Sequence, residues 1–244
     1  APLGDPKDLP TPIKWPDPTI WRFAAELGEP DLVVTSTPYT VKPEGQDKWW
    51  RPTVETGLTE PRWVRAIEVR PSYPGGRKSV HHVLTLLDQH EEGVTGLAST
   101  AAHSGSTMTA GLFMEWAVGK TGEMFPEDAG KLMLPGAKIR WEVHYYAVGE
   151  EIKDDKVELG VWFYRKGYQP KNRTILRMFN AAPGSELDIQ PGQTAMTQNF
   201  YVLPAPARLE NFQPHMHMRG KAMSMEAVFP DGRRELLSMV SDFQ

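Results

Sequence analysis

Cysteine is absent from this 244-residue sequence. Its absence excludes a disulfide framework, a zinc finger, a thiol nucleophile and an iron–sulfur cluster. No apolar run approaches the ~20 residues that cross a bilayer as a helix, so no membrane span is expected. The 27 Lys and Arg residues nearly balance the 31 Asp and Glu residues. That balance excludes a strongly basic nucleic-acid binder and an acidic disordered tail.

Helical periodicity is also scarce. Residues 1–29 predict a Pro-rich linker, with one short helix between the capping pair Asp17–Pro18 and Gly28. Later segments alternate apolar and polar residues and are rich in β-branched and aromatic side chains, which predicts strands. Turn clusters separate them, so we expect an all-β fold of the β-sandwich type. The expected strands are 62–71, 80–88, 137–148, 156–166, 174–181, 207–218 and 221–230.

A domain boundary is expected near 182–193, where the segment APGSELDIQPGQ is rich in turn residues. We expect an N-terminal β-sandwich over 30–183 and the start of a C-terminal one over 184–244. The final segment is too short for a sandwich of equal size. It therefore either completes the first domain or begins a second domain that is incomplete. The first residue is Ala1 rather than Met, so a mature or excised chain is expected.

Five of the seven histidines lie in apolar strand contexts. His215 and His217 form an H-x-H motif, and residues i and i+2 of a strand face the same side. Two imidazoles on one face can hold a metal ion, although two surface or packed histidines give the same spacing. His81 and His82 would face opposite sides of a regular strand, so both bind one ion only where the strand bends or bulges. His144, taken alone, also fits a core or interface residue.

The remaining chemistry is sparse. His90 and His103 lie in polar, turn-like segments, where we expect them to be solvated. Imidazoles without thiolates suit copper, zinc, iron or nickel, and no carboxylate near the histidine pairs completes a 2-His-1-carboxylate site. Four methionines between 216 and 225 alternate around the H-x-H motif. A thioether favours Cu(I), but methionine also fills gaps between strands. No phosphate-binding loop, dinucleotide fingerprint, HExxH or GxSxG is present.

The order of the motifs resembles a known family. The segments RWVRAIEVRP, VHHVLTLL, LPGAKIRWEVHYYAVGEE and FQPHMHMRGKAMSMEAVFPDGRREL resemble the copper type II, ascorbate-dependent monooxygenases, which include peptidylglycine α-hydroxylating and dopamine β-type enzymes. The resemblance runs from about residue 30 to the end. It is closest to bacterial members, in which a cytochrome c-like domain often precedes the core. It implies two jelly-roll-like β-sandwich domains with one copper ion each, and a periplasmic or extracellular location.

The resemblance also implies roles for the five histidines. In the family, the HH pair and the later VHY histidine bind one copper, which matches His81, His82 and His144. The HxH pair and a methionine further downstream bind the second, catalytic copper. This pair matches His215 and His217, and the family methionine would fall beyond the last residue here. In the family, O2 and the substrate react at the second copper, the first supplies an electron, and ascorbate or another reductant restores both.

Some residues depart from the family pattern. Gln213 occupies the position of an arginine that holds the peptide carboxylate in the peptide-amidating enzyme, so a glycine-extended peptide is not the expected substrate. The disulfides of the animal enzymes are missing. The sequence stops inside the expected second sandwich, so an excised piece of a longer protein is expected. Tyr145 and Tyr146 are expected near copper, although strand packing would explain both.

Three functional hypotheses follow. The first is a copper-dependent monooxygenase core that hydroxylates a C–H bond of a small organic substrate with O2 and an external reductant such as ascorbate or a cytochrome. The second is a copper-binding electron-transfer module that partners an upstream cytochrome c-like domain and has no hydroxylase activity. The third is a β-sandwich scaffold with surface histidines, which predicts no stoichiometric copper.

Overall fold

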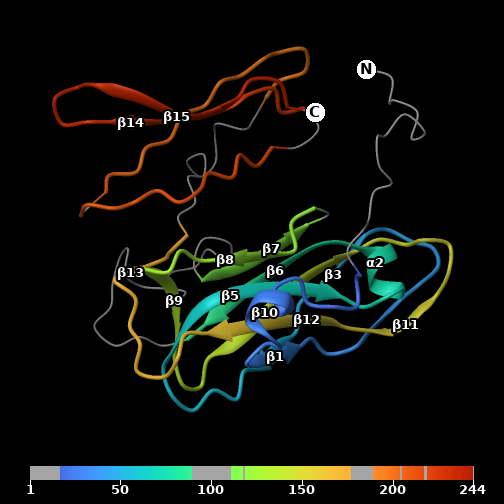
Figure 1. Cartoon of the computed structure of the whole chain (residues 1–244). Helices are drawn as coiled ribbons and strands as arrows, with labels where there is room; N and C mark the ends of the chain where they lie inside the picture. Colours follow the sequence, from blue (N-terminus) through green and yellow to red (C-terminus); the bar gives the residue numbers. More distant parts are fainter. Residues whose placement is uncertain are drawn as a thin grey trace, which may run out of the picture. The chain divides into compact units, whose positions relative to one another are not determined.

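The computed structural model describes residues 17–89, 111–117, 119–176, 189–203, 205–216 and 219–243. The chain divides into two compact units, Ala1–Met178 and Phe179–Gln244, whereas the sequence pattern places the division between 183 and 184. Strands build most of the regular structure (Figure 1). The expectation of an all-β, sandwich-type fold is therefore confirmed.

Two sheets form the N-terminal unit. The first has the order β1-β12-β5-β9-β13, with β8 also paired to β5, and the second has the order β3-β10-β6-β7, with β4 also paired to β10. A smaller pair joins β2 (Tyr39–Val41) to β11 (Ile152–Asp155). The strands of the first sheet are β1 (Leu32–Thr35), β5 (Arg62–Pro71), β8 (Gly122–Met124), β9 (Ala129–Met133), β12 (Val157–Phe163) and β13 (Asn172–Arg173). Those of the second are β3 (Lys48–Trp50), β4 (Thr53–Glu55), β6 (Val80–Asp88), β7 (Leu112–Ala117) and β10 (Lys138–Tyr145).

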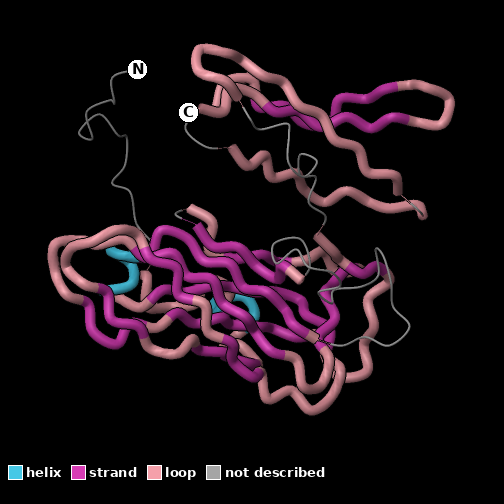
Figure 2. Tube along the Cα trace, turned by 180° about the vertical axis from the view of Figure 1, so that it is seen from behind, coloured by secondary structure: helices cyan, strands magenta, loops and turns pink. Residues whose placement is uncertain are grey.

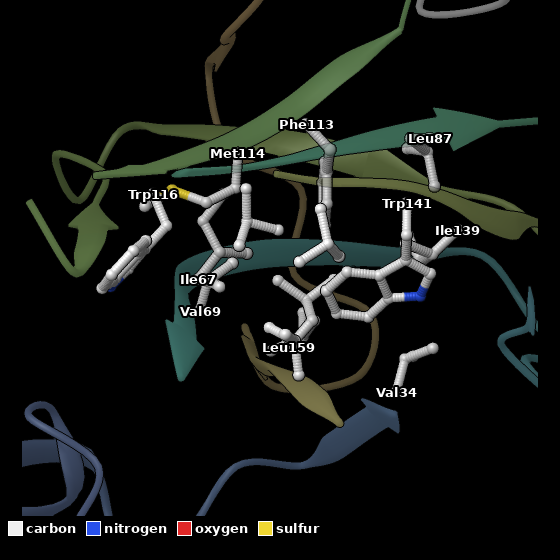
Figure 3. Packing of buried hydrophobic residues seen from close by; sticks show 14 of the residues in the cluster. Val34, Ile67, Val69, Leu87, Phe113, Met114, Trp116, Ile139, Trp141 and Leu159 are labelled. Carbon is white, nitrogen blue, oxygen red and sulfur yellow. The ribbon is translucent and has the colours of Figure 1, made fainter. Parts of the chain in front are cut away.

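Apolar side chains from both sheets form one core (Figure 3). Ile67 of β5 and Leu159 of β12 come from the first sheet, and Ile139, Trp141 and Val143 of β10 come from the second. All five are fully buried. Because side chains alternate along a strand, the residues between them on β10 face away from this core. His144, the residue after Val143, faces away from the core for the same reason.

The outer face of β5 is covered as well. Trp21 and the short helix α1 (Ala24–Leu27) pack on this face, where Trp21 meets the Trp162 ring edge-on at 5.9 Å between centroids. The helix ends at Gly28, as expected, where φ is 77°, a conformation that glycine adopts without strain. It begins later than expected because the Asp17 carboxylate caps a separate turn, accepting the Thr19 backbone N–H at 2.8 Å.

The C-terminal unit has little regular structure among its described residues. A hairpin of β14 (Met223–Val228) and β15 (Arg234–Val240) is its one described sheet. The strand expected over 221–230 is thus confirmed in its central part. The strand expected over 207–218 is wrong for 207–216, which form no ladder. Alternation makes a segment compatible with a strand, but a strand also needs a partner, and Pro214 has no N–H to donate to one.

Alternation located the long strands well. The expected strands 62–71 and 80–88 match β5 and β6, and β10 and β12 lie inside the expected 137–148 and 156–166. The strand expected over 174–181 is wrong for 174–176, and 177–181 lie outside the described residues. Both helices that the structure describes are short (Figure 2): α1 has 4 residues and α2 (Gly75–Ser79) has 5. Among the described residues, neither helix has the length or apolarity needed to cross a bilayer.

Candidate metal centre

A β-bulge at the start of β6 decides how the two adjacent histidines point. His144 of β10 lies opposite His82, but the next residue, Tyr145, lies opposite Val80. His81 is therefore the extra residue of the bulge, which re-aims its side chain. Adjacent histidines on a strand can bind one ion only where the strand bends or bulges. The pairing of β6 with β10 shows such a bulge here. The bulge thus brings His81 to the side of the sheet where His82 already faces His144.

The three imidazoles form a compact group, here called the histidine trio (His81, His82 and His144). One ring nitrogen from each residue lies within 4.8 Å of the other two. His144 Nδ1 lies 3.2 Å from His82 Nε2. The ring of His81 lies 5.2 Å from each of the other two rings between centroids. His81 is exposed and the others are half-buried, so the trio opens to solvent on the His81 side.

A buried hydrogen-bond network fixes the segment that leads into the bulge. Asp155 accepts hydrogen bonds from Tyr145 Oη at 2.7 Å and from Ser72 Oγ. The Ser72 hydroxyl in turn accepts the Gly76 N–H at 2.9 Å, at the start of α2. A side chain at Gly76 would come within 2.9 Å of Asp155 Oδ1, so the close approach requires glycine. The network joins β10 and β11 to α2, which runs directly into the two histidines of β6.

Asp47 sets the electrostatic environment of His144. Its carboxylate accepts a hydrogen bond from His144 Nε2, with 3.3 Å between Nε2 and Oδ2. A neutral imidazole that donates from Nε2 has its lone pair on Nδ1, the atom that faces His82. Burial lowers the pKa of His144 below its usual value, the Asp47 charge opposes that shift, and the nearby His81 adds to it. The lowered pKa favours the neutral form, which is the form that binds metals.

Aromatic rings flank the trio. Trp49 of β3 lies directly opposite His144, and the two rings stack at 4.5 Å between centroids and 7° between planes. The guanidinium of Arg51 lies 5.0 Å from the Trp49 ring, and Arg51 also pairs with Glu142 at 3.6 Å. On the other side, the Tyr146 ring meets the His81 ring at 90° and 6.2 Å. Rings on both sides restrict how the imidazoles can rotate.

The donor set fits a single transition-metal ion. Two imidazole nitrogens that share an ion at about 2.0–2.1 Å lie at most about 4 Å apart, so a movement of about 1 Å would close the trio around one ion. Neutral imidazole nitrogens without a thiolate suit copper, zinc, iron and nickel. The bond from His144 to Asp47 is the outer contact that metal-binding histidines commonly make. Among the described residues, this is the one group of three or more such side chains close enough to share an ion.

Of the other four histidines, only His215 lies among the described residues. His215 is exposed, in a segment without strand structure in the C-terminal unit. His217 lies outside the described residues, as do His90 and His103. The pairing of His215 with His217 at a second copper therefore stays a prediction.

Sequence reasoning named the three histidines that the structure brings together, but it missed their neighbours. Asp47 and Trp49 lie on or beside a 3-residue strand in a Pro- and Gly-containing stretch with no alternating pattern. The adjacent tryptophans Trp49 and Trp50 in a polar segment were the available signal. Tyr146 does lie beside His81. Tyr145 does not, because it faces the core and is 1% exposed.

The fold and the site together define an all-β chain with a solvent-open three-histidine centre on one sheet. No protein-family model matches the sequence, and no curated protein matches it.

Proposed function

We propose that this protein is the core of a copper-dependent monooxygenase, and that the histidine trio is its first copper site. The observation that carries the proposal is the bulge in β6, which brings His81 and His82 together with His144 on one side of the sheet. A bulge beside a functional group is a device for re-aiming side chains. The order of the HH, VHY and HxH motifs supports copper over the other metals that three imidazoles accept.

The chain's own residues prepare this site for an ion. The two half-buried imidazoles, His82 and His144, are held by the ladder between β6 and β10, and the exposed His81 leaves one side open. Asp47 holds the hydrogen of His144 on Nε2 and directs the Nδ1 lone pair inward. When bound, copper would supply one-electron chemistry through its Cu(I) and Cu(II) states. Three neutral nitrogen ligands support both states.

The proposed reaction hydroxylates a C–H bond of a small organic substrate with O2. Ascorbate or a cytochrome would act as the external reductant. His215 and His217 are the proposed ligands of the second, catalytic copper. This assignment depends on the H-x-H motif and on the family resemblance. The periplasm or the extracellular space is the proposed location.

One observation favours a second candidate function, a copper-binding electron-transfer module that partners a cytochrome c-like domain. All three residues of the trio belong to the N-terminal unit, so this site needs no residue from the rest of the chain. A single self-contained copper site is enough to pass electrons without hydroxylating a substrate.

Oxygen uptake separates the two functions. Copper-loaded protein with ascorbate and a panel of small organic substrates should consume O2 in step with hydroxylated product. His215→Ala should abolish product while the copper at the trio remains, and it serves as the matched control for oxidation by free copper. Oxidation of a reduced c-type cytochrome by the copper-loaded protein under anaerobic conditions, without product formation in air, would instead support the electron-transfer function.

A further inference from the structure

Two residues of the β3 segment contact one imidazole of the trio from outside. Trp49 stacks on the His144 ring at 4.5 Å, and Asp47 accepts the His144 Nε2 hydrogen bond at 3.3 Å. Residues i and i+2 of an extended segment face the same side, so Asp47 and Trp49 reach His144 together. Trp49 restrains the plane of the His144 ring, and Asp47 determines which ring nitrogen carries the hydrogen.

Trp49 is not a core residue. It is 39% exposed, whereas its neighbour Trp50 anchors β3 by packing on Tyr39 and donating its indole N–H to the Thr37 carbonyl at 3.2 Å. A large apolar ring that stays partly in contact with water contributes less hydrophobic stabilisation than a ring in the core. Its flat contact with His144 is close to parallel at 7°, and it also meets His82 edge-on at 5.0 Å. Trp49 therefore contacts two members of the trio.

The guanidinium of Arg51 also contacts the Trp49 ring. It lies 5.0 Å from the Trp49 ring and is held by Glu142 of β10. Arg51 and His144 thus both contact the Trp49 ring, and Trp49 and His144 lie opposite each other on β3 and β10. These two contacts limit rotation of the Trp49 ring, and the flat contact limits rotation of the His144 imidazole.

We propose that Asp47 and Trp49 are positioning residues for His144 as a metal ligand. Asp47 fixes the nitrogen that His144 presents to the ion, and Trp49 fixes the ring plane. The inference rests on the proposed function, because it takes the histidine trio as a metal site. Neither residue belongs to the group of three side chains close enough to share an ion, so both act through His144. Loss of an outer partner of this kind typically lowers metal affinity 10- to 100-fold.

The experiment uses Cu(II) as the probe and compares matched variants. The test variants are Asp47→Ala and Trp49→Leu, and Asp47→Glu tests rescue by a second carboxylate. Glu55→Ala is the control for loss of an exposed carboxylate, because Glu55 pairs with Lys138 of β10 at 2.8 Å and does not pair with His144. Trp50→Phe is the control for a disturbed β3. Circular dichroism and the urea midpoint confirm that each variant is folded.

Two readouts are measured on each variant. In metal-free protein, NMR reports the His144 ring protons, which the stacked Trp49 ring shifts away from their usual positions. We expect Trp49→Leu to remove this shift, Asp47→Ala to reduce it, and both controls to keep it. In a competition titration with a chelator, we expect the Cu(II) dissociation constant to rise 10- to 100-fold for Asp47→Ala and about 10-fold for Trp49→Leu. Asp47→Glu should recover part of the affinity.

The outcomes separate this inference from the proposed function. Wild-type protein that binds copper at the trio, with Asp47→Ala and Trp49→Leu binding it equally well, would overturn the positioning role alone. A Trp50→Phe variant that loses as much affinity as Trp49→Leu would also overturn it, since any loosening of β3 would then have the same effect. Wild-type protein that binds no copper would overturn the proposed function and this role with it.

Discussion

Lys131 of β9 is buried inside the sandwich. Its burial predicts how the free energy of unfolding changes with pH. The side chain is 6% exposed, and its ammonium donates to the Phe113 carbonyl. It also lies 5.5 Å from the ring centroids of both Phe113 and Phe125. Among the described residues, no carboxylate forms a salt bridge with it. Burial lowers the pKa of Lys131 from 10.5 to about 8, an effect that Glu123 opposes and Lys120 increases.

The direction in which the free energy of unfolding changes with pH follows from how many protons the folded and unfolded states bind. Unfolded chains keep the Lys131 proton up to pH 10.5, whereas the folded protein releases it near pH 8. Between these values the unfolded state binds more protons, so the free energy of unfolding rises with pH. Below pH 8 both states are protonated and the cost of burying the charge is fully present. A shift of one pKa unit corresponds to about 1.4 kcal/mol, so the gain from pH 7 to pH 9.5 is about 2 kcal/mol.

The perturbation is Lys131→Met, which keeps a long side chain and removes the titrating group. Urea unfolding followed by tryptophan fluorescence at pH 7 and pH 9.5 measures the difference in stability between wild type and variant. We expect that difference to change by about 2 kcal/mol in favour of the wild type at the higher pH. Lys138→Met, at a lysine paired with Glu55 on the surface, serves as the control. A difference that stays constant over this range would refute the reasoning, because Lys131 would then remain protonated in the folded protein.

Two further predictions concern the packing that supports the site. Asp155→Ala removes the acceptor of the Tyr145 and Ser72 hydroxyls, so we expect a loss of about 1–3 kcal/mol in unfolding free energy; an unchanged urea midpoint would contradict the anchoring role of this network. Gly130→Ala would place a Cβ 2.7 Å from the Val64 carbonyl oxygen, which cannot move without disturbing the β5–β9 pairing. We expect a loss of about 1–3 kcal/mol, and thermal unfolding at the wild-type temperature would show that β9 has more room than this contact implies.

The long strands could be predicted from sequence because their pattern is local. In β10, apolar residues alternate with polar ones over 8 residues, so this segment alone shows which face is buried. The 9 residues of β6 are rich in valine and leucine but do not alternate strictly. The 3-residue strands β2, β3 and β4 are too short to show a period. They form because longer strands offer them a free edge. A local pattern holds no information about such an edge.

The histidine trio was predictable only in part. The residue types and their order point to a metal site, but the bulge that joins His81 to the other two depends on where β10 pairs with β6. That register is a property of two strands that lie far apart in sequence, Val80–Asp88 and Lys138–Tyr145, and it follows from which faces the whole sheet buries. Asp47 and Trp49 were missed for the same reason, since only pairing across β3 and β10 places them beside His144.

The most direct test of the central claim counts copper. Metal-free protein is reloaded with Cu(II), excess metal is removed, and bound copper per chain is measured alongside the EPR spectrum. We predict that the copper ion held by nitrogen ligands at the trio is lost in His82→Ala and in His144→Ala and kept in His215→Ala, which removes a ligand of the proposed second ion only. No stoichiometric copper in the wild type, or the same copper in the His82→Ala and His144→Ala variants, would contradict it.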